Sequence, residues 1–280
     1  MQEQHFTTVI TPKNKLLDFQ LKEVYKYRDL IFLFVRRNFV SQYKQTILGP
    51  AWALIQPLLT TVVFTVVFGN LAGLAPGGVP SFLFFMSGNI AWHYFSNCLT
   101  STANTFTGNA AVFGKVYFPR LVSPISTVLT NLISFGIQFF LFLVFLVIYW
   151  VKGDVHPTLY ALMLPVLLLH MAMLSLGCGI IVSSLTTKYR DLKMLISFGV
   201  QLWMYGTPVA YDIGIIPEKY LNLYMLNPMT PIITLFRKGF LNLWEFDLSY
   251  YLYSWVFTFV VLFIGLLLFN RVEKTFMDTV

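Results

Sequence analysis

Residues 114–124 read Gly-Lys-Val-Tyr-Phe-Pro-Arg-Leu-Val-Ser-Pro, and they determine the fold that we expect. Lys115 and Arg120 are isolated charges: residues 45–114 contain no Lys, Arg, Asp or Glu, and residues 121–151 contain none either. A short basic segment with prolines between two long uncharged runs is typical of a hairpin that meets the cytoplasm and returns into lipid. The stretch therefore predicts a membrane protein with spans on both sides of it.

The composition agrees with a membrane protein. Of the 280 residues 57% are hydrophobic, 18% are aromatic and only 11% are charged, whereas soluble domains carry about 25% charged residues. The net charge of +7 comes from basic residues spread between apolar runs, so we expect no nucleic-acid partner. Cys98 and Cys178 lie inside apolar runs and are expected to be buried thiols rather than a disulfide.

The apolar runs predict an all-α integral membrane protein with six transmembrane helices, because each run is about as long as the roughly 20 residues that cross a bilayer. A cytoplasmic N-terminal part, residues 1–44, would precede a transmembrane domain, residues 45–280. The predicted spans are Ile47–Leu71, Ser81–Thr107, Leu121–Val151, Thr158–Leu185, Met194–Tyr211 and Leu248–Asn270.

The N-terminal part is expected to lie on the membrane surface. From Asn14 onward, Leu17, Leu21, Val24 and Tyr25 recur with helical spacing, which predicts an amphipathic interfacial helix that is too polar to span. Packing on a soluble partner is the alternative for this helix. Residues 30–44 would then form an elbow at the interface. No signal peptide is visible, so we expect the N-terminus to stay inside.

The segment 212–247 is apolar but is interrupted by Pro217, Pro228 and Pro231. Short apolar segments at membrane depth are tolerated only where they are buried in protein or line a cavity. We therefore expect two short re-entrant or interfacial helices that form a lid on the outer side, with a seventh and an eighth span as the alternative.

The distribution of Lys and Arg predicts the orientation. With the N-terminus inside, fifteen of the 19 basic residues fall on cytoplasmic segments, and only four fall outside. Both termini would then be cytoplasmic. The outer four are Lys152, Lys219, Arg237 and Lys238.

Several kinds of chemistry are not supported by the sequence. It contains no G-x-x-x-x-G-K-[ST] phosphate loop, no H-E-x-x-H and no G-x-S-x-G motif, and the four histidines are too scattered for a metal site. No predicted span carries a charge, so a proton or sodium gradient has no ionisable relay to act on. A transport subunit powered by another polypeptide is favoured over an enzyme. A membrane-embedded transferase would have to use His93.

The predicted spans are rich in amides, hydroxyls and aromatic rings. Such groups suit a sugar polymer, because rings lie against apolar C–H faces and amides bond to hydroxyls. Aromatic belts and helix packing are the alternative explanation for these residues. The candidates for sugar contact are Trp52, Gln56, Gln201, Trp203 and Tyr205.

A set of short motifs occurs in a distinctive order: Arg36-Arg-Asn-Phe-Val-Ser-Gln-Tyr-Lys44, Leu48-Gly-Pro-Ala-Trp52, Gln56-Pro57, Ser87-Gly88 with Trp92 and Phe95-Ser96, Lys115-Val-Tyr-Phe-Pro-Arg120 with Pro124, Tyr189-Arg-Asp-Leu192, Pro208-Val209 with Tyr211, and Leu226-Asn-Pro-Met229 with Phe236-Arg237. With these motifs the chain resembles the membrane subunit of ABC-2-type polysaccharide exporters, the permeases of O-antigen, teichoic acid or capsular polymers. The resemblance covers about residues 14–272. Lys44 stands where that family often has arginine, and Pro50 also departs from it.

The resemblance implies a permease in the bacterial cytoplasmic membrane. Two copies of the chain would pair around a channel lined by spans 1 and 5, and two separate ATPase subunits would bind ATP and Mg²⁺ below. This chain would hold no cofactor and no metal. Its cargo would be a lipid-linked polysaccharide, with a small molecule such as a drug or antibiotic as the alternative.

The resemblance also suggests roles for particular residues. Arg36, Arg37 and Lys44 would meet a lipid pyrophosphate or the headgroups, because guanidinium forks suit phosphate oxygens. Simple topology anchors are the alternative for these three residues. The residues expected to couple the permease to the ATPases are Lys115, Val116, Tyr117, Phe118, Pro119, Arg120, Arg190 and Asp191. The residues expected at the outer gate are Pro217, Asn227, Pro228 and Arg237.

Overall fold

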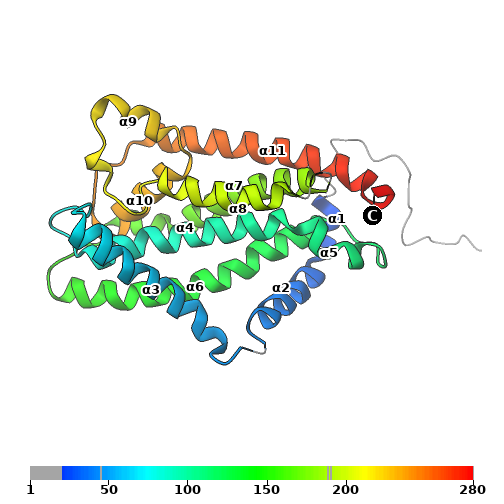
Figure 1. The fold of residues 1–280 in the computed structure, drawn as a ribbon, viewed down its shortest axis with the longest axis horizontal. Helices are drawn as coiled ribbons and strands as arrows, with labels where there is room; N and C mark the ends of the chain where they lie inside the picture. The colour runs from blue at the N-terminus through cyan, green and yellow to red at the C-terminus, as the bar shows by residue number, and fades with distance from the viewer. Residues whose placement is uncertain (1–20, 45, 188, 190, 280) are drawn as a thin grey trace, which may run out of the picture.

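The computed structural model describes residues 21–44, 46–187, 189 and 191–279, which form helices and connecting loops without a strand. Figure 1 shows the long helices lying side by side along the longest axis of the molecule. The all-α expectation is confirmed. Four helical segments are long and apolar enough to cross a membrane: Trp52–Leu71, Val122–Val151, Leu159–Thr186 and Leu248–Glu273.

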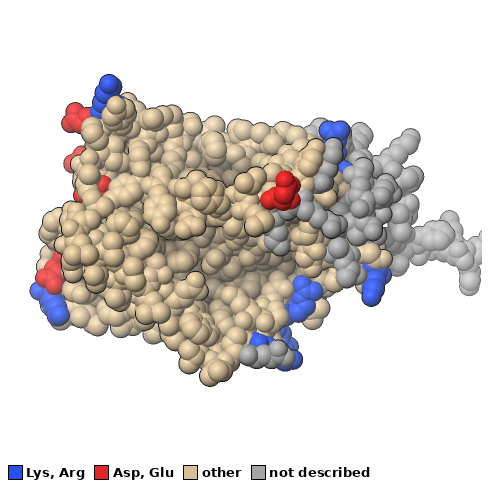
Figure 2. Space-filling view, in the orientation of Figure 1, with Lys and Arg blue, Asp and Glu red and all other residues tan. Residues whose placement is uncertain are grey.

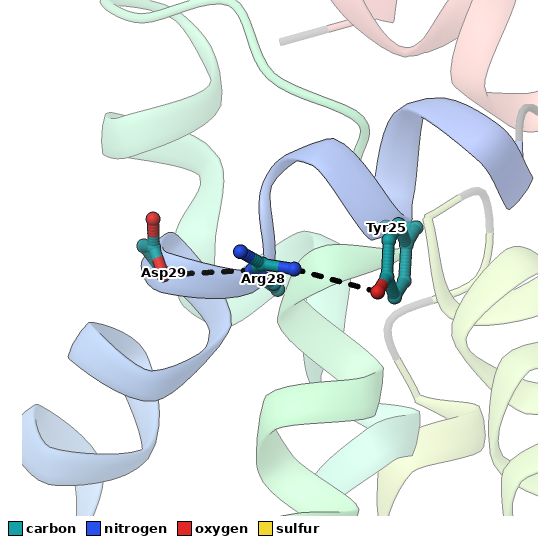
Figure 3. A network of polar contacts seen from close by, with 3 residues as sticks. All are labelled: Tyr25, Arg28 and Asp29. Atoms are coloured by element: carbon teal, nitrogen blue, oxygen red, sulfur yellow. Dashed lines mark hydrogen bonds and ion pairs between the residues drawn. The ribbon is translucent and has the colours of Figure 1, made fainter.

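Two helices precede the first of these segments. Helix α1 (Leu21–Lys26) and helix α2 (Arg28–Tyr43) meet at Tyr27, and α2 packs against α6 (Val122–Val151). Figure 3 shows the junction, where Arg28 donates to the hydroxyl of Tyr25 at 3.4 Å and lies 4.0 Å from a carboxylate oxygen of Asp29. Both ion-pair partners are exposed, so the pair contributes little stability. The predicted start of the amphipathic helix at Asn14 lies outside the described residues.

The first apolar segment has little protein around it. A 3-10 turn, η1 (Gly49–Ala51), leads into α3 (Trp52–Phe64), which continues as a π-helix, η2 (Thr65–Leu71). Helix α3 packs on α4 and α6, while its remaining face exposes apolar side chains such as Leu59 and Val63. Such a face is suited to lipid or to another protein surface.

Helix α4 (Ser81–Ala103) lies at the centre of the bundle, with α3, α6 and α7 packed around it. The prediction of one helix from Ser81 to Thr107 is wrong, because the helix is interrupted at Asn104 and α5 (Thr105–Phe113) follows. The side-chain amide of Asn104 bonds to the carbonyl of Thr100, an alternative to the helical main-chain pattern.

The segments after α8 follow the expected pattern. After α8 (Leu192–Tyr205) come η4 (Ile213–Ile215), α9 (Glu218–Met225) and α10 (Met229–Leu241), so the two short helices predicted in this region are present. Helix α8 ends before the predicted Tyr211, since Gly206 and Pro208 stop it. In Figure 1 α9 and α10 lie at one end of the bundle, whereas α1, α5 and the C-terminus lie at the other.

The tightest helix pair joins α7 (Leu164–Thr186), which follows the 3-10 turn η3 (Leu159–Met163), to α11 (Leu248–Thr279). Glycines make this contact possible. A Cβ on Gly177 would lie 2.9 Å from the backbone of Leu262, and a Cβ on Gly265 would lie 2.8 Å from the carbonyl oxygen of Gly177. The close approach of these helices relies on small residues, as is usual in membranes.

We predict that Gly177→Ala destabilises the purified protein, because the added methyl group meets backbone atoms that cannot move aside. Overpacking of this kind costs about 1–3 kcal/mol, which would appear as a lower midpoint of thermal unfolding in detergent. Gly136→Ala on α6 is the matched control, because a Cβ there meets nothing within 4 Å. Equal midpoints for the two variants would contradict the assigned contact.

Candidate functional site

Charged residues on the face drawn in Figure 2 gather toward the two ends of the molecule and leave an uncharged band between them. The end that carries α1, α5 and the C-terminus includes the loop from Gly114 to Leu121. The other end carries α9 and α10. The candidate functional residues fall into three groups: this loop, a polar groove between helices, and a buried arginine at the α10 end.

The loop between α5 and α6 has an exposed half and an anchored half. Lys115, Val116 and Tyr117 are exposed, with 72% of Tyr117 open to solvent, whereas Phe118 and Pro119 are buried. The ring of Phe118 lies edge-on to Phe34 of α2 at 5.5 Å between centroids. The loop therefore rests on α2 and presents its first half outward.

Arg120 fixes the end of this loop to α11. Its Nη1 donates to the main-chain oxygen of Glu273 at 2.6 Å, and its Nε lies 3.9 Å from the Glu273 carboxylate. Burial lowers the pKa of Arg120, and the charge of Glu273 opposes that effect. Arg120 thus links the loop to α11 through Glu273, which lies 153 residues further along the chain.

The second loop predicted to contact a partner precedes α8. Asp191 is exposed and caps this helix, because its Oδ1 accepts a hydrogen bond from the main-chain nitrogen of Leu192 at 3.1 Å. Arg190 lies outside the described residues. Tyr189, next to it, is 51% exposed. The described part of this loop therefore exposes the ring of Tyr189 and the carboxylate of Asp191, which caps α8.

Two hollows, of about 280 Å³ and 380 Å³, lie between α2, α3, α4, α5 and α6. We call them together the polar groove. Gln42, Ser101 and Asn131 line both hollows, so the two adjoin each other. The first is also lined by Tyr43, Trp52, Ala53, Gln56, Pro57, His93, Asn97, Ser134 and Gln138. The second is also lined by Arg37, Asn38, Ser41, Asn104, Gly108, Asn109, Ser123, Thr127 and Thr130.

The structure brings some of the predicted contact residues into this groove. Trp52 and Gln56 line the first hollow and Arg37 lines the second. The guanidinium of Arg37 donates to the Asn38 side-chain oxygen at 3.0 Å. Arg36 and Lys44, which were predicted to act with Arg37, are exposed on the same N-terminal segment but line neither hollow.

The other predicted sugar contacts lie on α8, apart from the groove. Trp203 donates from its indole nitrogen to the Asn227 side-chain oxygen at 2.9 Å, and its ring packs on Phe95. Gln201 and Tyr205 are exposed. Within one chain, Gln201, Trp203 and Tyr205 line neither hollow.

Three groove residues on α6 were missing from the predicted site. Asn131, Ser134 and Gln138 follow one another at intervals of three and four residues, which places them on one face of the helix. That polar stripe in an otherwise apolar run was a usable signal in the sequence. Asn97 of α4 also lines the groove and was not predicted as a contact.

Arg237 of α10, which the sequence analysis counted among the four outer basic residues and assigned to the outer gate, is buried. Only 1% of its surface is exposed. Its Nη1 donates to the carbonyl of Pro208 at 2.6 Å, its Nη2 donates to that of Val209 at 2.9 Å, and its guanidinium carbon lies 3.7 Å from the ring centroid of Phe84. Burial lowers the pKa of Arg237 to about 9, so the side chain stays charged at neutral pH.

A glycine on α4 makes room for this guanidinium. A Cβ on Gly88 would lie 2.7 Å from Nη2 of Arg237 and 2.9 Å from the carbonyl oxygen of Val209.

Of the other predicted gate residues, Asn227 and its neighbour Pro228 lie close to the turn that binds Arg237. Asn227 donates to the carbonyl of Gly206 at 2.9 Å and to the hydroxyl of Thr207 at 2.8 Å. Pro228 is buried, and its carbonyl accepts a hydrogen bond from Ser254 of α11. Pro217 is exposed and precedes α9.

The chain is similar in sequence to known membrane permeases. The family model described as "ABC-2 type transporter" matches residues 29–241. An O-antigen export system permease protein RfbA from Klebsiella pneumoniae is 27% identical over 89% of this chain and 94% of the relative. Another O-antigen export permease RfbA, from Myxococcus xanthus, is 30% identical over 79% of this chain and 83% of the relative. The polysialic acid transport protein KpsM of Escherichia coli is 21% identical over 87% of this chain and 93% of the relative.

We predict that Arg237→Lys destabilises the protein although it keeps the positive charge. A lysine cannot bond to both carbonyls in the planar, forked manner of arginine, and each lost charge-assisted bond costs roughly 1.5–3 kcal/mol. The unfolding midpoint in detergent should therefore fall for Arg237→Lys, and also for Gly88→Ala. Lys238→Met, at the next position, is the control and should change little. An unfolding midpoint for Arg237→Lys equal to that of the parent protein would refute the stabilising role of the Arg237 hydrogen bonds.

Proposed function

The chain belongs to the ABC-2 type transporter family, and from that premise we propose that it is the permease subunit of an ATP-driven exporter of polysaccharide. Its cargo is a lipid-linked polymer of the O-antigen kind, which it moves across the bacterial cytoplasmic membrane. The observation that carries this proposal is the alignment with O-antigen export permeases over almost the full length of both chains. The first hollow of the polar groove, which no Lys, Arg, Asp or Glu lines, agrees with a hydroxyl-rich cargo.

We infer that six helices cross the membrane. Beyond the four apolar segments, α4 is the fifth: its 23 residues rise about 34 Å at 1.5 Å per residue, enough for a bilayer core of about 30 Å. Helix α8, with 14 residues, is the sixth and is completed by the turn that follows it. The positive-inside rule then directs the α5–α6 loop and both termini to the cytoplasm, and α9 and α10 outward.

The energy source in this proposal is a separate ATPase. The chain has no phosphate loop for ATP, and the sequence offers no charged relay inside the predicted spans. Val116 and Tyr117 form an exposed apolar tip at the end assigned to the cytoplasm, which suits contact with a soluble partner. Through Phe118 and Arg120, movement of this tip would reach α2 and α11.

Two copies of the chain complete the channel in this proposal. Helix α8 exposes large apolar side chains, including Phe198 and Leu202, and α3 exposes Leu59 and Val63. Pairing of two copies would bury these faces and bring the α8 residues Gln201, Trp203 and Tyr205 toward a pathway shared with Trp52 and Gln56. The α9–α10 segment, with Pro217, Asn227, Pro228 and Arg237, would cover its outer end.

We predict that Arg120→Ala and Tyr117→Ala abolish or strongly reduce polysaccharide at the cell surface while the protein still inserts into the membrane. Arg120→Ala removes the link to Glu273, and Tyr117→Ala removes half of the exposed tip. The measurement is surface polymer in a gene-deletion strain that carries each variant, with permease abundance determined in parallel.

Tyr220→Ala is the matched control for this experiment. Tyr220 lies on α9 at the opposite end and is 51% exposed, so its loss should leave surface polymer unchanged. Normal surface polymer with Arg120→Ala and Tyr117→Ala would refute the coupling role. Normal surface polymer in the deletion strain itself would refute the polysaccharide cargo.

A further inference from the structure

We propose that Trp203 is a positioning residue: through Asn227 it fixes the C-terminal end of α8 to the start of α10, so that the two helix ends move together during transport. This inference rests on the proposed function, in which α8 lies along the pathway and the α9–α10 segment covers its outer end. It gives Trp203 a role other than the predicted contact with sugar.

The indole nitrogen of Trp203 is already engaged within the chain. Its Nε1 donates to the side-chain oxygen of Asn227 at 2.9 Å. The ring lies edge-on to Phe95 of α4, with 5.1 Å between centroids, and its centroid lies 6.2 Å from that of Trp92. A tryptophan side chain has this one N–H donor and no acceptor. While the bond to Asn227 lasts, Trp203 therefore has no hydrogen bond to offer to a sugar hydroxyl.

Asn227 connects the two helices through both halves of its amide. Its Nδ2 donates to the main-chain oxygen of Gly206 at 2.9 Å and to the hydroxyl oxygen of Thr207 at 2.8 Å, in the turn after α8. Its Oδ1 accepts from Trp203 and, at 3.2 Å, from the main-chain nitrogen of Met229, the first residue of α10. An amide offers two N–H groups and an oxygen with two lone pairs. The bonds that Asn227 makes therefore use both its donor and its acceptor side.

Thr207 closes this network on Trp203. The hydroxyl of Thr207 donates to the main-chain oxygen of Trp203 at 2.8 Å and accepts the bond from Asn227. The three residues thus form a closed ring of hydrogen bonds. Because hydrogen bonds in a connected network strengthen one another, loss of one of them weakens the rest.

Core packing contributes little to the attachment of α8 in one chain. Among the described residues of this helix only Val200 is buried, whereas Leu195, Phe198 and Leu202 are exposed. Helix α10, by contrast, is buried along most of its length and packs on α4, α7 and α11. The hydrogen bonds of Asn227 therefore tie a weakly packed helix to a firmly packed one.

The test uses this chain with its ATPase, reconstituted in inside-out vesicles. Transfer of lipid-linked polymer into the vesicles and hydrolysis of ATP are both measured at several polymer concentrations. Trp203→Phe deletes the N–H group and keeps a ring against Phe95. We expect the polymer transferred per ATP to fall about fivefold, the effect of losing one hydrogen bond of the ring. The KM for polymer should stay unchanged.

A second variant tests whether the two residues act through one bond. Asn227→Ala should lower the polymer transferred per ATP at least as much as Trp203→Phe. The double variant should resemble Asn227→Ala alone, because residues that act through each other are not additive. Trp150→Phe is the matched control: it deletes the same N–H group on α6, where Trp150 is 56% exposed, and should change neither rate.

Three results would overturn the positioning role. A higher KM for polymer in Trp203→Phe, with an unchanged ratio of polymer to ATP, would show a contact with sugar. Equal falls in transfer and ATP hydrolysis would show a loss of folded protein only. Additive effects in the double variant would show that Trp203 and Asn227 act independently.

The positioning role and the proposed function can fail separately, because hydrogen exchange of main-chain amides needs no cargo. In Trp203→Phe, exchange in residues 203–210 and 227–233 should be about threefold faster than in the parent complex and in Trp150→Phe. Unchanged exchange would overturn the link between α8 and α10. If the deletion strain keeps its surface polymer, the proposed function fails, and the exchange measurement still decides whether the link exists.

Discussion

The structure depends on one physical constraint: a charge that is buried away from water must have its hydrogen-bond partners within the protein. Arg237 meets this condition. Its guanidinium bonds to two carbonyls of the turn after α8 and stacks on Phe84 of α4, in a slot that exists because residue 88 is glycine. One side chain of α10 thereby holds three segments together at one end of the bundle.

A second arginine performs a related task at the other end. Arg120 bonds to the main chain of Glu273, and the neighbouring Phe118 packs on Phe34, so the short loop is held between α2 and α11. The two joints differ in exposure: Arg237 is fully enclosed, whereas Arg120 adjoins the exposed Val116 and Tyr117. In the proposed mechanism, the anchored loop with its exposed tip would pass movement inward, and the enclosed Arg237 contacts would hold the opposite end together.

The sequence allowed the helical class, the position of the loop between α5 and α6 and the short helices near Pro217 and Pro228 to be predicted, because these follow from local composition. The interruption of the second span at Asn104 and the early end of α8 were missed, since both depend on local capping and turn chemistry. The burial of Arg237 could not be derived, because its carbonyl partners lie 28 and 29 residues away in the chain. The groove was found only in part: Trp52, Gln56 and Arg37 were named, whereas the Asn131–Ser134–Gln138 stripe was not.

Transport in a purified system tests the central claim most directly. Inside-out vesicles containing this chain and its ATPase would receive lipid-linked polymer on their outer, cytoplasmic face, and an added glycosidase would digest whatever polymer remains outside. If the chain is the permease, ATP should render the polymer resistant to the enzyme, and vesicles with the ATPase alone should give no protection. Polymer that stays fully digestible with ATP and both subunits present would contradict the account.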